Sequence, residues 1–184
     1  MLASRQPGQP LKQTVMGVRV IRPGPVMKYS NHGNIFLRSC FAFNTFITAL
    51  RIPSDIIAGY SLISYVPSGL AAILKGVPSV ATYHESWAGG DWIRHKGLWT
   101  GLFGEVWERF ALLLPWKKII AVSGVTKDAL VARGIPEKKI VVVHNGVDTK
   151  EIREVRGVKT KIKHKRSTLP AICCVSRLVP TKRV

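Results

Sequence analysis

The chain has 184 residues, of which 46% are hydrophobic and 21% are charged. This balance excludes an intrinsically disordered chain, and the length is enough for one full domain or for one domain and part of another. Lys and Arg number 28 against 10 Asp and Glu, which gives a formal net charge of +18. Such a charge favours a polyanionic partner, namely nucleic acid, anionic lipid headgroups or a phosphorylated substrate.

The cysteines and the apolar segments indicate the cellular setting. Cys40, Cys173 and Cys174 give neither a disulfide framework nor the spacing of a zinc site, so we expect a reducing, cytoplasmic location and no metal. The first residues lack the apolar core of a signal peptide. The stretch 56–74 is uncharged and long enough to span a membrane, but glycines and a proline interrupt it. The sequence therefore predicts a soluble or peripheral protein.

The first half of the chain carries alternating strand and helix signals. The run 15–21 (VMGVRVI) predicts a strand, and 36–50 is apolar enough for a helix. Residues 55–58 predict a second strand, 64–75 a helix and 79–83 a third strand. A strand, helix and strand at this spacing form a βαβ unit, so we expect a parallel sheet.

The most informative stretch runs from Gly76 to Glu85, GVPSVATYHE. Gly76 is the residue type that commonly follows a helix C-terminus, and the apolar run after it predicts a buried strand. Polar residues at the carboxyl end of such a strand lie where open α/β sheets bind their ligands. His84 and Glu85 are therefore the first candidates for a functional site, although either side chain could also be structural or merely solvated.

A loop and a long helix are predicted next. Residues 86–96 (SWAGGDWIRHK) contain two consecutive glycines and predict a loop long enough to cover a site. The segment 98–114 has the spacing of an amphipathic helix, with Glu105, Glu108 and Arg109 on its polar side. We expect its aromatic and aliphatic stripe to pack in the core; the stripe comprises Trp99, Leu102, Phe103, Val106, Phe110, Leu113 and Leu114.

The second half continues the alternation. Residues 118–122 predict a buried strand, and Ser123 stands at the N-cap of a helix that continues to Arg133. Residues 140–143 predict a further strand that ends in an Asn-Gly turn, and 171–175 predict another. The fold class is therefore α/β, with a Rossmann-like parallel sheet flanked by helices.

Four segments together resemble the family-4 retaining glycosyltransferases of the GT-B fold. They are GVPSVATYHE, IIAVSGVTKDAL, KIVVVHNGVD and the terminal VSRLVPTK, in the same order and at similar spacing. The resemblance covers roughly residues 52–184. It implies the N-terminal half of a two-domain fold, in which the first domain handles the acceptor and the second the nucleotide-sugar donor.

The resemblance also implies an activity and its partners. Members move a sugar, here expected to be a hexose, from a nucleotide-sugar donor to an acceptor hydroxyl with retention at the anomeric carbon. The acceptor would be a sugar, a lipid-linked molecule or a small molecule. No cofactor and no metal are implied, because the nucleotide sugar is a substrate.

Three residues match family positions with known roles. His84 matches the histidine that lies near the transferred sugar, so the resemblance implies a catalytic position for it. Arg177 and Lys182 match the pair that holds the donor diphosphate, where fixed cations stabilise the leaving group's growing negative charge. Glu85 remains a candidate on the acceptor side.

Departures from the family pattern predict a truncated chain. The glycine-rich loop after the family's first strand is missing, and no two glutamates here have the eight-residue spacing of the family's donor-binding pair. We expect residues 1–149 to form an acceptor-side domain that is incomplete at its start, 150–168 a basic linker, and 169–184 the beginning of a donor-binding domain. Such a chain would be weak or inactive alone.

Two other functions are weighed against this one. The net charge permits a nucleic-acid-binding protein, but zinc-finger spacing, RNA-binding aromatic signatures and basic helices are missing from the sequence, so nucleic acid is an unfavoured partner. A sugar-nucleotide epimerase would share the two-domain architecture. The basic run 150–166 is either a solvated linker or a docking element for an anionic membrane at the inner face.

Overall fold

The structure is a computed structural model, and it describes residues 1–28, 34–87 and 89–150. The chain divides into two compact units, Met1–His144 and Asn145–Val184. The predicted strand 171–175 and most of the predicted basic linker lie outside the described residues. The first unit contains all the helices and strands of the described residues that have been given bounds.

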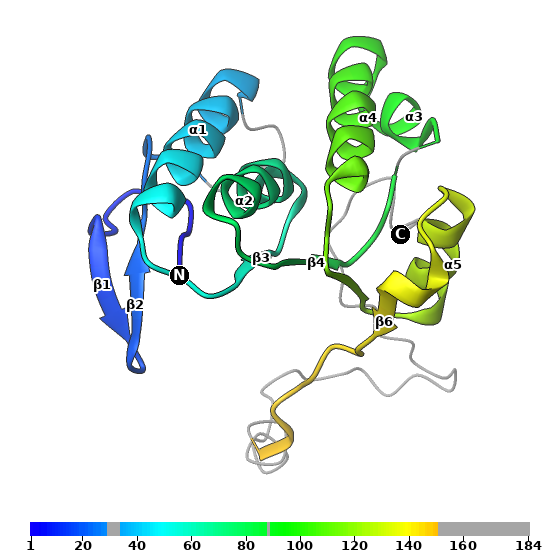
Figure 1. The fold of residues 1–184 in the computed structure, drawn as a ribbon. Coiled ribbons are helices and arrows are strands. Elements are labelled where there is room, and N and C mark those ends of the chain that lie inside the picture. Colours follow the sequence, from blue (N-terminus) through cyan, green and yellow to red (C-terminus); the bar gives the residue numbers. More distant parts are fainter. Residues whose placement is uncertain (29–33, 88, 151–184) are drawn as a thin grey trace, which may run out of the picture. The chain divides into compact units, whose positions relative to one another are not determined.

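A four-stranded parallel sheet forms the centre of this unit (Figure 1). The spatial order is the same as the order along the chain: β3 (Ile57–Gly59), β4 (Ser79–Tyr83), β5 (Lys118–Ala121) and β6 (Ile140–Val142). Val80 and Ala81 of β4 each pair with a residue on both neighbouring strands. The predicted parallel α/β sheet is thus confirmed.

Helices connect the strands and cover the sheet. α2 (Leu62–Lys75) joins β3 to β4, and α5 (Gly124–Ala132) joins β5 to β6 through the short 3-10 helix η1 (Glu137–Lys139). α1 (Ile35–Arg51) packs against α2, as Figure 1 shows. Because the helical segments between β3, β4, β5 and β6 are crossovers between neighbouring parallel strands, the polar residues that end β3, β4 and β5 meet at one edge of the sheet.

The helix ends follow the sequence signals. Ser123 caps α5, with its Oγ accepting a hydrogen bond from the Thr126 amide at 3.1 Å. Gly76 ends α2 in the left-handed conformation (φ 65°), where a side chain would be strained. Both caps were predicted at these residues, and both are confirmed.

The hydrophobic core lies between the sheet and the helices. Tyr83, Ala81 and Ala121 of the sheet have no exposed surface. Gly69 of α2 packs closely against the Leu114 side chain. A Cβ added at Gly69 would lie only 2.6 Å from that side chain. The remaining members come from α2, from the segment 111–116, and from β5, α5, β6 and the loop after α5; they are Tyr65, Val66, Ala111, Leu112, Trp116, Ile119, Leu130, Ile135 and Ile140.

The N-terminal strand prediction is wrong in one respect. The run 15–21 does not form one strand but spans a hairpin, in which β1 (Lys12–Val15) pairs antiparallel with β2 (Val18–Ile21). Met16 and Gly17 both have positive φ (47° and 79°), which is the geometry of a two-residue hairpin turn. The apolar alternation continues through the turn, so periodicity alone could not show it.

The predicted loop 86–96 is also partly wrong. Asp91–Lys96 forms a short helix, α3, which packs against α4 (Leu98–Leu113). Gly97 between them has φ 77°, so the chain turns sharply from one helix into the other. Two glycines of α4 allow the close packing: a Cβ at Gly101 would lie 2.4 Å from the Ile93 Cα, and one at Gly104 would lie 2.6 Å from the Trp92 ring.

The orientation of α4 is the reverse of the prediction. Glu105 and Glu108, expected on the outer side, are 7% and 2% exposed. Trp99 and Leu113, expected in the core, are each 82% exposed, and the rest of the predicted stripe on α4 is exposed as well. The physical reason is that the glycine and glutamate face makes both the close contact with α3 and a set of hydrogen bonds to the preceding loop.

Candidate functional site

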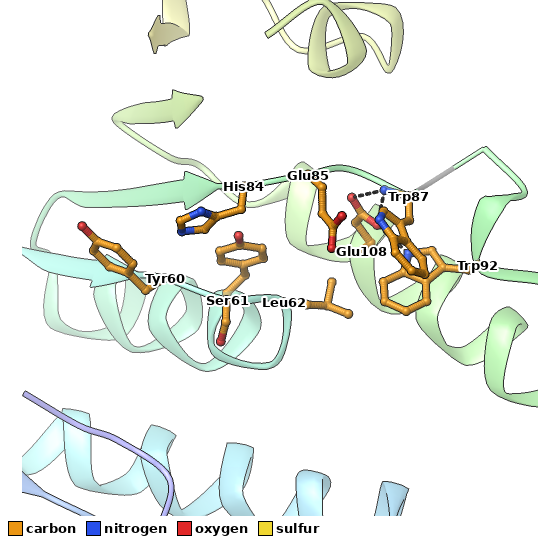
Figure 2. Close-up of a pocket in the computed structure, with 9 residues that line it drawn as sticks. Tyr60, Ser61, Leu62, His84, Glu85, Trp87, Trp92 and Glu108 are labelled. Atoms are coloured by element: carbon orange, nitrogen blue, oxygen red, sulfur yellow. Dashed lines mark hydrogen bonds between the residues drawn. The ribbon is translucent and has the colours of Figure 1, made fainter. Parts of the chain in front are cut away.

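A pocket of about 180 Å³ opens at the carboxyl end of β4. His84 and Glu85 directly follow this strand and line the pocket. Figure 2 shows Glu85 between two groups of rings, with His84 and Tyr60 on one side and Trp87 and Trp92 on the other. This is the sheet edge at which the sequence predicted a site.

The β3 side of the pocket is formed by the turn into α2. Tyr60 and Ser61 follow β3, and both backbone amides donate to the Ser64 Oγ, at 3.1 and 3.0 Å. These bonds occupy amides that the start of a helix would otherwise leave without a partner. The turn thereby places the exposed Tyr60 ring near His84, with ring centroids 6.4 Å apart.

Two stacked tyrosines lie beneath the strand ends. The Tyr65 and Tyr83 rings are 4.3 Å apart, and the Tyr65 hydroxyl donates to the Thr82 carbonyl at 2.6 Å. Burial, reinforced by the Glu108 carboxylate, raises the pKa of Tyr65 above its usual value. Burial raises the pKa of Tyr83 in the same way, with Tyr65 and Glu108 as lesser causes. Both phenols therefore stay protonated at neutral pH.

Glu108 fixes the segment that follows Glu85. Its carboxylate accepts hydrogen bonds from the Ser86 hydroxyl at 2.6 Å, from the Trp87 amide at 3.1 Å and from the Trp92 indole Nε1 at 2.5 Å. A buried carboxylate is stable only with such partners. The Trp87 and Trp92 rings, 4.9 Å apart, are thus held at the rim of the pocket (Figure 2).

Glu105 holds the next part of the same loop. It accepts from the Gly89 amide at 2.7 Å and the Gly90 amide at 3.2 Å, and it pairs with Arg109 at 2.8 Å. Burial alone would raise the pKa of Glu105, but the hydrogen bonds from Gly89, Arg109 and Gly90 outweigh it and lower the pKa below its usual value. Glu105 is therefore ionised at neutral pH.

The pocket combines an imidazole, a solvated carboxylate and aromatic faces. His84 and Glu85 are both exposed, so their polar atoms are available to a ligand. A carboxylate accepts hydrogen bonds from hydroxyl groups, and an imidazole can donate to or accept from the same ligand. Aromatic rings with a few convergent polar groups are the usual lining of a small-molecule site. The arrangement suits a polyhydroxylated, partly apolar molecule.

The structure brings together two of the four predicted site residues. His84 and Glu85 line the same pocket, and the His84 carbonyl accepts a hydrogen bond from the Thr126 hydroxyl at 3.2 Å. Arg177 and Lys182 lie outside the described residues, so their role stays a prediction. Among the residues described, no cluster of three or more His, Cys, Asp or Glu side chains could hold a metal ion.

Sequence reasoning missed the residues that support the pocket. Glu105 and Glu108 were assigned to the polar side of their helix, and Trp87 and Trp92 to a loop long enough to cover a site, with no role in the pocket given to any of the four. A signal was present: Gly101, Gly104 and Ala111 share a helix face with the two glutamates. A face of small residues indicates close packing, whereas the predicted stripe was chosen on hydrophobicity alone.

The sequence profile described as Glycosyltransferase Family 4 matches residues 1–151. The chain belongs to this family. No curated protein sequence matches the chain. The family match covers the whole pocket, including His84 and Glu85.

Solved structures show the same kind of fold. Sucrose-phosphate synthase from Thermosynechococcus elongatus is 14% identical, with a TM-score of 0.55 over 81% of this chain and 76% of that one. This likeness shows a GT-B-type domain and no more. Anabaena HepE in complex with UDP-glucose is 18% identical (TM-score 0.45), and a UDP-N-acetylglucosamine 2-epimerase is 14% identical (TM-score 0.42). They align over 72% and 65% of this chain but over only 35% and 36% of their own lengths.

Proposed function

We propose that this glycosyltransferase moves a hexose from a nucleotide-sugar donor to an acceptor hydroxyl with retention of anomeric configuration, and that the described unit binds the acceptor. The observation that carries the proposal is the pocket at the end of β4, where His84 and Glu85 lie between aromatic rings. The family supports the reaction type. In support of the donor class, HepE, a structural neighbour of low similarity, was solved with UDP-glucose.

Each polar side chain has one role in the proposed transfer. In the transfer, the bond between the anomeric carbon and the diphosphate oxygen breaks, and the oxygen leaves with the electron pair. The acceptor oxygen bonds to the same face of that carbon, and its proton passes to the departing diphosphate oxygen. Glu85 accepts a hydrogen bond from the acceptor hydroxyl, and His84 lies beside the transferred sugar. Arg177 and Lys182 stabilise the charge on the leaving diphosphate.

The location and the role of the rest of the chain follow from the same proposal. In this proposal the nucleotide-sugar donor is a substrate found in the cytoplasm, and the protein acts in the cytoplasm. Residues 1–149 serve the acceptor, and residues 169–184 belong to the part that binds the donor. Among the residues described, no helix is both long and apolar enough to cross a membrane.

Acceptor binding can be tested on the chain as it stands. A panel of sugars and glycolipid headgroups is screened by saturation-transfer NMR against the wild type and against Glu85→Ala and His84→Ala. The matched controls are Asp128→Asn and His95→Ala, both exposed and outside the pocket. We expect a sugar to bind the wild type and both controls, and its signal to fall with Glu85→Ala and His84→Ala. Binding that is equal in all five proteins would contradict the acceptor role.

Donor binding needs a separate measurement. Nucleoside diphosphates and nucleotide sugars are titrated calorimetrically into wild type, Arg177→Ala and the control Arg19→Ala, an exposed arginine of β2. Saturable binding lost only in Arg177→Ala supports the diphosphate role. Where turnover is detected, nucleoside diphosphate must appear together with a glycosylated acceptor; release of the diphosphate without that product favours an epimerase instead.

A further inference from the structure

The outward face of α4 is an unusual surface for a water-exposed helix. Seven large apolar side chains of this helix are exposed, and the helix buries its glycines and glutamates instead. Trp99 and Leu113 are the most exposed of the seven at 82% each, and Val106 is 60% exposed. The others are Leu98, Leu102, Phe103 and Phe110. We call this set the α4 apolar face.

The α4 apolar face carries no negative charge. The helix has two acidic residues, Glu105 and Glu108, and both point inward to the loop that they hold. Arg109 is the one basic residue along Leu98–Leu113 and its side chain is 66% exposed. The burial of the glutamates therefore leaves an outward apolar surface without an exposed carboxylate.

A second feature adjoins this face. A groove of about 820 Å³ shares Arg109 and Leu113 with the helix, and its floor is apolar. Three cationic residues line it, Arg109, Arg133 and Lys139, and no acidic residue does. The groove thus places positive charge directly beside exposed apolar side chains. Arg94 and Lys96 before the helix, and Lys117 and Lys118 after it, are exposed as well.

We propose that the α4 apolar face and the adjoining groove dock this protein on an anionic lipid bilayer. Trp, Phe and Leu enter the boundary between headgroups and acyl chains, and the cations of the groove bind anionic headgroups. The charge pattern favours a bilayer over a protein partner, since nothing on the face offers a carboxylate to pair with cations. The inference does not depend on the sugar substrate.

The test compares matched pairs of exposed apolar residues. Trp99→Ser/Leu113→Ser removes two side chains of the α4 apolar face, and Met16→Ser/Val125→Ser removes two of similar exposure elsewhere (99% and 80%). Each protein is sedimented with phosphatidylcholine vesicles with and without phosphatidylglycerol. We expect the first variant to bind the anionic vesicles about tenfold or more weakly than wild type, and the second to bind like wild type.

The cations of the groove are tested in the same assay. Arg109→Gln/Lys139→Gln is compared with Lys12→Gln/Lys138→Gln, which removes the same charge from exposed sites outside the groove. We expect the first pair to weaken anionic-vesicle binding more than the second. The basic run 150–166 is present in every variant, so its contribution cancels. An excess of inorganic phosphate should not release the vesicles.

Insertion gives an independent measurement. Brominated acyl chains quench a tryptophan that enters the bilayer, and the quenching should disappear in Trp99→Phe. Equal vesicle binding by the two serine variants, or no quenching of Trp99, would overturn the proposal. Self-association of the wild type in sedimentation velocity, lost in Trp99→Ser/Leu113→Ser without any vesicle binding, would overturn it in favour of a protein interface.

Discussion

α2 and α4 are two apolar helices of the same unit, yet they bury different kinds of side chain. α2 buries Tyr65, Val66 and Ala72, so its apolar stripe packs in the core. α4 buries Gly104, Glu105 and Glu108 and exposes its apolar stripe. The difference shows that hydrogen-bond demand in a neighbouring loop can decide which way a helix faces, because buried amides without partners are costly.

The largest expected effect comes from removing the carboxylate that holds the pocket rim. Glu108→Ala leaves the Ser86 hydroxyl, the Trp87 amide and the Trp92 indole without their acceptor. We expect a loss of roughly 3 kcal/mol in the free energy of unfolding, measured by urea titration. Glu137→Ala removes an exposed glutamate that pairs with Lys127 at the surface; it is the control and should change stability much less. Equal effects of the two substitutions would mean that Glu108 is not buried.

Two neighbouring leucines of α4 test which face of this helix is buried. Leu112 is 9% exposed and belongs to the core, whereas Leu113 faces outward. Leu112→Ala should cost about 2–3 kcal/mol of unfolding free energy, while Leu113→Ala should stay within about 0.5 kcal/mol. The orientation predicted from periodicity places Leu113 in the core, and it gives a large loss for Leu113→Ala instead. A large loss in Leu113→Ala would therefore restore the sequence-based orientation.

The glycines of α4 give an effect of smaller size. Alanine in a helix is ordinarily more stable than glycine by about 1 kcal/mol. Gly101→Ala should nevertheless destabilise by roughly 1–2 kcal/mol, because its Cβ would meet the α3 backbone. Gly124→Ala, where a Cβ meets no atom within 4 Å, should be neutral or stabilising. Both substitutions are measured by the same urea titration. A stabilising effect of Gly101→Ala would show that α3 does not pack against α4 at Gly101.

The smallest expected effect is the pH-dependent change at Gly89 and Gly90, which Glu105 holds. The pKa of Glu105 is lowered in the folded state, so its contribution to stability is complete above the ordinary glutamate pKa of about 4.3 and is lost as pH falls toward the lowered value. The amide resonances of Gly89 and Gly90 should shift with a midpoint below about 4.3. Glu105→Gln should abolish the shift. A midpoint at or above the ordinary value would rule out the proposed hydrogen bonds.

The sequence predicted the features that depend on local patterns. The strand 79–83, the caps at Gly76 and Ser123 and the position of His84 and Glu85 at the sheet edge all follow from short-range spacing and turn chemistry. These signals are local because a cap or a buried strand is specified by its own residues.

The features that failed depend on contacts between segments. The inward face of α4 is set by amides of the loop 86–90, which lie far from the glutamates in the chain. The stripe of Trp99 to Leu113 has the period of a core helix, so hydrophobicity could not show which face is buried. The Met16-Gly17 turn was missed for a similar reason. The apolar pattern of the two strands continues through it, and the positive φ angles that make the turn are not visible in that pattern.

Hydroxyl-radical footprinting of the unmodified protein, read residue by residue by mass spectrometry, tests the orientation of α4 most directly. Trp99 lies on the outward face, and Trp116 is 1% exposed in the core just after the helix. We predict that Trp99 is oxidised rapidly and Trp116 slowly, with Phe110 and Leu113 following Trp99. Protection of Trp99 to the level of Trp116 in the monomeric protein would contradict the outward orientation of the α4 apolar face and the lipid-docking surface proposed on it.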